Sequence, residues 1–312
     1  MNKTITFRNA ILASFLVFIA IMLLVALQVF FIHSEEEKLR QFESSVKQIN
    51  DTNMLIFRAE QDFLANELIN PLFYKTGSST HLDQLKQLVI ENTELINDGL
   101  HNRTFQKYGI DSIANLLNLA VLSHNSIFMN VVELQKRRGF KDDGMEGQMR
   151  TYIHQIESEY PEVDKLLILT IRRVEKDYLL RKDFVYKSKM AELYDKLLRT
   201  MQKENKSKRK KIIKLMNGYY TSFIKLTELE VEIGTNNNAG LRAELKHTFE
   251  VSETLLDQML TNAQLISREQ TRILFIVLQL SMALAVILSI IIALVLSKII
   301  TKPIKKLSDM ML

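Results

Sequence analysis

The sequence predicts an all-α protein in which two transmembrane helices flank a large helical domain. Residues 10–32 and 273–296 are two uncharged apolar segments, and each exceeds the roughly 20 residues that a helix needs to cross a bilayer. The chain of 312 residues holds only nine glycines and three prolines, a balance that favours helix over a sheet rich in turns. Between the two apolar segments, apolar side chains recur at helical spacing.

The charges beside the apolar segments predict the topology. Lys3 and Arg8 precede the first segment, and four lysines follow the second, whereas residues 35–37 are three glutamates. The positive-inside rule then places both termini in the cytoplasm and residues 33–272 in the periplasm of a bacterial inner membrane. A cleaved signal peptide is the alternative for the first segment, but its apolar run is too long and no small-residue cleavage site follows.

Periodicity and turn signals predict the helices of the periplasmic region. Pro71 and the sequence TGSST end the first helix, Gly139 ends another, and Asp142 or Asp143 is a candidate N-cap. Pro161 is expected to bend or break the helix that contains it. The predicted helices cover residues 34–73, 81–99, 110–138, 145–182, 186–203, 206–233, and from 241 onward into the second apolar segment.

Two sequence motifs of this region each occur twice, and the shorter of them is called the repeated phrase. Residues 56–64 read IFRAEQDFL and residues 171–179 read IRRVEKDYL. Likewise GMEGQMRTYIHQIE at 144–157 aligns without a gap to GLRAELKHTFEVSE at 240–253. Two copies of one supersecondary unit predict two similar helical bundles. Some of the long helices are expected to run through both, with the bundles stacked along the membrane normal.

The second copy resembles a known family. RRVEKDYLLRKDFVY at 172–186 is similar to the signature of helical bimodular sensor domains, found in bacterial chemoreceptors and some sensor kinases, and residues 223–253 resemble its Gly-turn segment. The resemblance covers roughly residues 34–270 and is weaker in the first half, which lacks the doubled arginine. TKPIKKLSDM at 301–310 looks like the start of a HAMP linker.

The resemblance implies a fold, an assembly state and a class of ligand. Members of the family have two stacked four-helix bundles, usually form dimers, and hold small carboxylates in pockets. A cytoplasmic signalling module is then expected after residue 312. The division of the chain becomes a cytoplasmic N-terminus (1–9), a first span (10–32), a periplasmic sensor domain (33–272), a second span (273–296) and the beginning of a HAMP linker (297–312).

Arginines in the repeated phrase are the first candidates for a ligand site. On a helical projection, Arg173 lies within a second apolar face that Leu166, Leu169 and Leu180 form. A buried arginine needs a partner, and two partners are possible: Asp177 one turn on, or the carboxylate of a ligand. The candidate ligand-binding residues, with basic residues of the repeated helix starts, are Arg58, Glu60, Arg150, Arg172, Arg173, Glu175, Arg242 and Lys246.

Other classes of function lack a motif. The six histidines do not pair at metal-ligand spacing, cysteine is absent, and no nucleophile elbow, phosphate loop or catalytic carboxylate pair occurs. We therefore expect no enzymatic activity, no metal, no cofactor and no nucleic acid partner.

The sequence thus predicts the sensory input region of a transmembrane receptor. A small organic acid binds in the periplasm, the last helix transmits the signal to the HAMP segment, and the output is chemotaxis. Two alternatives remain open: the input region of a sensor histidine kinase, and a membrane-anchored helical scaffold that binds a protein partner.

Overall fold

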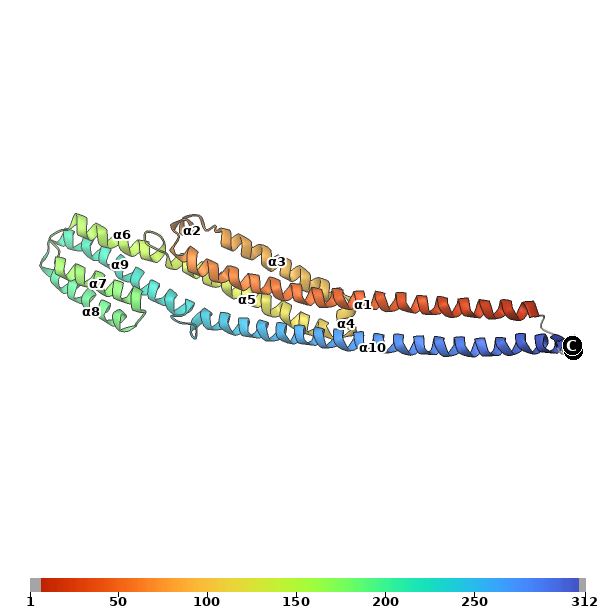
Figure 1. Cartoon of the computed structure of the whole chain (residues 1–312). Helices are drawn as coiled ribbons and strands as arrows, with labels where there is room; N and C mark the ends of the chain where they lie inside the picture. The colour runs from red at the N-terminus through yellow and green to blue at the C-terminus, as the bar shows by residue number, and fades with distance from the viewer. Residues whose placement is uncertain (1–6, 309–312) are drawn as a thin grey trace. The chain divides into compact units, whose positions relative to one another are not determined.

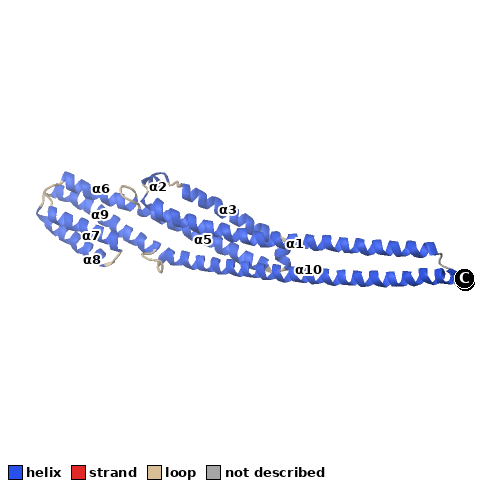
Figure 2. Cartoon of the chain, viewed as in Figure 1, coloured by secondary structure: helices blue, strands red, loops and turns tan. Residues whose placement is uncertain are grey.

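The chain is helical throughout the part that the structure describes. The computed structural model describes residues 7–308, and no strand occurs within that range (Figure 2). The all-α prediction is therefore confirmed for these residues. Residues 1–6 and 309–312, parts of the predicted cytoplasmic N-terminus and HAMP segment, lie outside it.

Ten α-helices make up the described residues. Figure 1 labels them α1 to α10: Phe7–Asn66, Pro71–Thr76, Thr80–His101, Arg103–Lys107, Ile110–Arg138, Gly144–Glu159, Lys165–Arg181, Val185–Thr200, Lys206–Ile233 and Gly240–Ser308. The bounds of α5 and α9 agree with the prediction. Pro161 does break its helix, between α6 and α7. Pro71 does not end the first helix as expected, because α1 ends at Asn66 and Pro71 begins α2; the short helices α2 and α4 were not predicted.

Side-chain caps start five of these helices. Before α3, the Ser79 hydroxyl accepts a hydrogen bond from the Leu82 N–H at 3.4 Å. Asn70, Asn102 and Asn205 each accept a hydrogen bond from the backbone N–H two residues later, and Asp164 accepts one from Leu167. The cap satisfies one of the N–H groups that the first turn of a helix leaves unpaired. Asp143, a predicted N-cap, occupies that position before α6 but makes no such bond.

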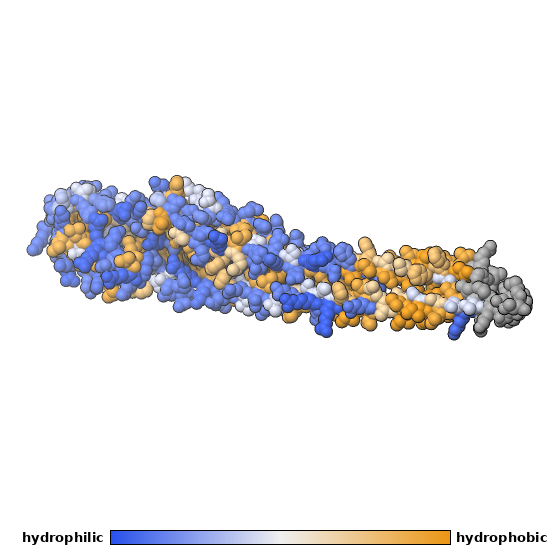
Figure 3. All heavy atoms as spheres, in the orientation of Figure 1, coloured by the Kyte–Doolittle hydropathy of each residue, from blue (hydrophilic) through white to orange (hydrophobic). Residues whose placement is uncertain are grey.

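Two helices are long and apolar enough to cross a membrane. They are the N-terminal part of α1 and the C-terminal part of α10, and almost none of their apolar residues is buried. Apolar surface covers these two segments in the space-filling view (Figure 3). A core helix of a soluble protein would instead bury such residues.

The chain divides into two compact units. Of the described residues, the first holds 7–47, 101–110 and 259–308. Within it Phe42 is buried against Phe105, whose ring packs edge-on at 5.1 Å between centroids. The second holds residues 48–100 and 111–258 and contains all the candidate ligand-binding residues.

Two hydrophobic cores lie within the second unit. The first core packs α1, α2, α3 and α5 around Phe63, Phe73 and Phe128, and Leu245 of α10 lies against it. The second core packs α6, α7, α8 and α9 around Tyr178, Tyr219 and Phe223. A smaller cluster joins α5 to α9 through Val131, Leu134, Leu229 and Ile233.

The expectation that long helices run through both cores is wrong. No helix of the described residues contributes buried side chains to both larger cores. Instead, a turn with two glycines separates α5 from α6, and a similar turn separates α9 from α10. Gly139 and Gly234 end the first helix of each pair, and Gly144 and Gly240 begin the second, all with positive φ. Only glycine adopts that conformation without cost, so the sequence GxxxxG or GxxxxxG breaks the helix.

Candidate functional site

The repeated phrase buries the same glutamate twice. Glu60 of α1 and Glu175 of α7 occupy equivalent positions and are 2% and 5% exposed. Their neighbours match as well, since Phe63 and Tyr178, three residues on, both lie fully inside their cores. A carboxylate in such a place requires a hydrogen-bond partner. The buried charge of the phrase is therefore its glutamate.

The arginine of the phrase faces solvent in both copies. The side chain of Arg173 is 83% exposed and lies 4.0 Å from Asp177, and Arg58 is also exposed. Placing Arg173 in a buried apolar seam was therefore wrong. Its flanking leucines, Leu166 and Leu180, are exposed too, because α7 packs only through its other face in this chain.

Glu175 has a partner for each oxygen. The hydroxyl of Tyr219 on α9 donates to Oε2 at 2.7 Å, and the ammonium of Lys176 lies 2.8 Å from Oε1. Burial and the nearby Glu175 charge raise the pKa of Tyr219 well above its usual value, so the hydroxyl remains a donor. This arrangement satisfies the carboxylate internally.

Glu60 has a partner for one oxygen only. Nε2 of His124 on α5 lies 2.9 Å from Oε2, and Nδ1 of the same ring lies 2.7 Å from the Thr248 hydroxyl on α10. Oε1 is buried and makes no hydrogen bond among the described residues. Burial raises the pKa of Glu60 above its usual value, and His124 opposes part of that rise.

A cavity of about 410 Å³ opens beside Glu60, between α1, α5, α10 and the turn before α10. We call it the α1–α5–α10 cavity. Phe57 and Phe249 stack in its wall with ring centroids 4.2 Å apart. Its polar lining consists of Glu60, Gln61, His124, Asn237, Arg242 and Lys246. Its size is within the usual range for small-molecule sites.

Three of the eight predicted residues therefore come together here. Glu60 lines one cavity with Arg242 and Lys246, although it lies far from both in the sequence. Arg242 and Lys246 are one helical turn apart, so they share a face of α10. Glu250 lies 3.9 Å from the Lys246 ammonium, and both of these side chains are exposed. Arg242 and Lys246 together form a positive wall that suits a carboxylate.

Two other predicted arginines have partners from the chain itself. Arg150 donates to Asp142 at 3.0 Å, and Arg172 donates to Glu157 at 2.9 Å. Neither lines the α1–α5–α10 cavity. The two arginine side chains are 36% and 33% exposed. Each ion pair therefore contributes little to the free energy of unfolding.

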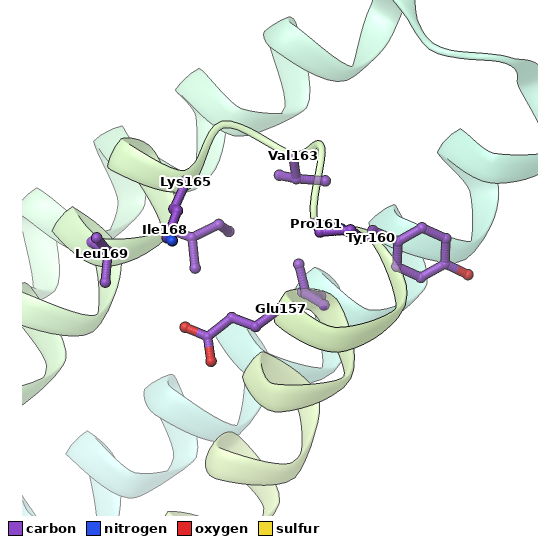
Figure 4. A pocket seen from close by; sticks show the side chains of 8 residues that line it. Glu157, Tyr160, Pro161, Val163, Lys165, Ile168 and Leu169 are labelled. Atoms are coloured by element: carbon purple, nitrogen blue, oxygen red, sulfur yellow. The ribbon is translucent and has the colours of Figure 1, made fainter.

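A second cavity, of about 250 Å³, lies where α6 passes into α7. Figure 4 shows Glu157 reaching it from α6 and Ile168 and Leu169 from α7, with Pro161 and Val163 on the connecting turn. Its lining is mainly apolar, and its carboxylate, that of Glu157, already pairs with Arg172. Lys165 also lines this cavity, so its lining has one charge of each sign and does not favour an organic anion.

An ion cluster outside the predicted residues lies near the glycine turns. Arg138 donates to Glu230 at 2.5 Å and approaches Glu146, and Lys182 also pairs with Glu230. Burial alone would raise the pKa of Glu230, but Arg138 and Lys182 together hold it below its usual value. The cluster ties the ends of α5, α7 and α9 to the start of α6.

His124 is one of three polar lining residues, with Gln61 and Asn237, that sequence reasoning missed. It interrupts a stripe of buried residues on α5 that includes Leu117, Val121, Phe128 and Val131. A polar residue at a core position is a signal readable from the sequence, because burial demands a hydrogen-bond partner. The identity of that partner, Glu60 of another helix, required the structure.

The chain matches no family model, no curated protein and no solved structure in comparisons with known proteins. Within the described residues, no group of three or more histidine, aspartate or glutamate side chains is placed to hold a metal ion. The geometry of the α1–α5–α10 cavity is therefore the main basis for a functional proposal.

Proposed function

We propose that the chain is the sensory input region of a bacterial transmembrane receptor that binds a small organic acid. The observation that carries the proposal is the positive wall of the α1–α5–α10 cavity. Arg242 and Lys246, which form this wall, lie at the start of α10, and α10 continues as one helix to Ser308 through the second apolar segment.

Ligand binding acts through the position of α10. A carboxylate at Arg242 and Lys246 pulls this helix toward α1 and α5, which supply the rest of the lining. The bound acid stabilises one arrangement of α10 over another and so shifts their populations. An uninterrupted helix carries that difference onward, since it has no hinge. Chemotaxis is the proposed output, through a HAMP segment that begins near residue 297.

The two cores are proposed to be the two stacked four-helix bundles of the helical bimodular type. Four long helices meet at each core: α1, α3, α5 and α10 at the first, and α6, α7, α8 and α9 at the second. The resemblance of residues 172–186 to that family supports the assignment. Glycine turns, rather than shared helices, would join the bundles.

The proposed topology places residues 33–272 in the periplasm and both termini in the cytoplasm of the inner membrane. The chain has no cysteine, so single introduced cysteines report their side of the membrane cleanly. Ser207→Cys, at an exposed position in the first turn of α9, should react with a membrane-impermeant maleimide in intact cells. Asn2→Cys should react only after the membrane is opened, and the reverse pattern would refute this topology.

Thermal unfolding with a panel of acids tests the ligand proposal. The full chain in detergent or nanodiscs, followed by far-UV circular dichroism, should unfold at a higher temperature with at least one class of small carboxylate. A ligand at 100 times its Kd adds about 2.7 kcal/mol to the free energy of unfolding. No rise with any acid would favour the alternative of a scaffold that binds a protein partner.

A further inference from the structure

The two copies of the repeated phrase differ at one residue next to the buried glutamate. In the second copy, Lys176 follows Glu175, and its ammonium lies 2.8 Å from Oε1. In the first copy, Gln61 follows Glu60, and Oε1 of Glu60 makes no hydrogen bond among the described residues. The copy beside the positive wall thus lacks the ammonium partner that the other copy has.

The unpartnered oxygen is an acceptor whichever way the protons are placed. The Thr248 hydroxyl donates to a backbone carbonyl of its own helix at 3.0 Å, so the Nδ1–H of His124 donates to that hydroxyl. Nε2 then either donates to an ionised Glu60 or accepts from a protonated one. Both assignments use Oε2, and both leave Oε1 free to accept.

A buried carboxylate oxygen without a donor is costly. Oε1 is covered by protein atoms, so a donor from the α1–α5–α10 cavity reaches it only when the Glu60 side chain turns toward the cavity that it lines, and that contact lowers the cost. In the second copy, an ammonium group forms an ion pair with the corresponding oxygen. Charge-assisted hydrogen bonds of this kind are about twice as strong as neutral ones.

We infer that the α1–α5–α10 cavity selects an amino acid over a simple carboxylic acid. The ligand's carboxylate binds Arg242 and Lys246, and its ammonium group binds Oε1 of Glu60, in the place that Lys176 takes in the second copy. The inference rests on the proposed function and narrows its class of ligand. A cavity with a positive wall and an unpartnered acidic oxygen is complementary to a zwitterion.

Two matched series of acids test this selection. Propionate, lactate and alanine share a three-carbon skeleton with hydrogen, hydroxyl or ammonium at carbon 2, as succinate, malate and aspartate do with four carbons. In the series that stabilises the full chain, the amino acid should bind about tenfold or more tightly than the unsubstituted acid, because one charge-assisted bond separates them. Thermal unfolding at graded ligand concentrations gives the Kd values.

A lysine swap between the copies provides the variants. Gln61→Lys places an ammonium beside Glu60 at an exposed position, so the variant should fold and lose the preference for the amino acid. Lys176→Gln, the reverse swap in the second copy, should leave the preference intact. The first variant replaces glutamine with lysine beside Glu60, and the second replaces lysine with glutamine beside Glu175. The second therefore controls for the change of charge at a site outside the cavity.

The outcomes separate this inference from the proposal on which it rests. Equal binding of the unsubstituted and amino acids, or an unchanged preference in Gln61→Lys, would overturn the amino acid selection while leaving an acid site. No stabilisation by any member of either series would overturn the acid site, and the selection with it.

Discussion

The two glutamates of the repeated phrase are both buried, but they differ in the partners that compensate for burial. Tyr219 and Lys176, both from this chain, are the partners of the two Glu175 oxygens. His124 is the partner of one Glu60 oxygen, and the other makes no hydrogen bond among the described residues. A fully satisfied buried carboxylate fixes the packing of its helices. A partly satisfied one at the wall of a cavity is a place where a ligand gains free energy. The same residue therefore has a structural role in one copy and a proposed binding role in the other.

Removing the Tyr219 hydroxyl should destabilise the second core. Tyr219→Phe keeps the ring but leaves the buried Oε2 of Glu175 without its donor, at a cost of about 1–3 kcal/mol. Tyr220→Phe is the matched control, because the ring that stacks on Tyr194 at 4.4 Å is retained. We expect the control to change stability by less than about 0.5 kcal/mol. Equal effects in urea unfolding would show that the Glu175 bond contributes little.

The misplacement of Arg173 shows the limit of a helical projection. Periodicity found two apolar faces on α7, and both exist, but only the face with Leu167, Ile171 and Tyr178 is covered in this chain. A projection records which residues share a face. It does not record which face another helix will cover, because that depends on contacts distant in sequence.

The glycine turns are the elements that separate the two cores. In both turns the glycine that ends the first helix lies against the backbone before the second, so that a Cβ on Gly234 would approach the Ala239 carbonyl oxygen to 1.9 Å. A side chain there meets backbone that cannot move aside. The repeat in the sequence predicted the position of both turns, since each holds a pair of glycines at matching places.

Alanine at Gly234 should therefore be strongly destabilising. The variant combines positive φ, which costs about 1–2 kcal/mol for a residue with a Cβ, with a collision that shifts the turn. Gly109→Ala isolates the first effect, because Gly109 has φ of 70° but a Cβ added there would meet no atom within 4 Å. In thermal unfolding, the melting temperature of Gly234→Ala should be well below that of Gly109→Ala. Equal melting temperatures would mean that the close approach is unimportant.

At the scale of the molecule, the sequence predicted the helices better than their contacts. Apolar spacing and turn residues are local, and they located α5 and α9 to the residue. The Glu60–His124 pair joins residues 64 apart, and the Arg138–Glu230 pair joins residues 92 apart. Nothing local indicates such partners. Arg242 and Lys246 could be predicted as site residues only because both lie at the start of the repeated helix, residues 240–253.

The uncovered face of α7 supports a proposed homodimer. Leu166 and Leu180 are 76% and 81% exposed, and a second copy of the chain would remove them from water. Replacing both leucines with glutamate should convert a dimer in detergent to a monomer, as measured by light scattering after size-exclusion chromatography. Leu72→Glu, on α2, is a control at a leucine of similar exposure. A dimer that survives the double change would place the interface elsewhere.

The central claim is that Arg242 and Lys246 bind the carboxylate of a ligand. Isothermal titration calorimetry of the full chain, with the acid that stabilises it most, tests this most directly. We predict that Arg242→Gln with Lys246→Gln raises Kd by about 100-fold or more, since charge-assisted hydrogen bonds are worth about 1.5–3 kcal/mol each. Arg150→Gln, whose arginine pairs with Asp142 outside the cavity, should leave Kd unchanged. Unaltered binding in the double variant would contradict this claim.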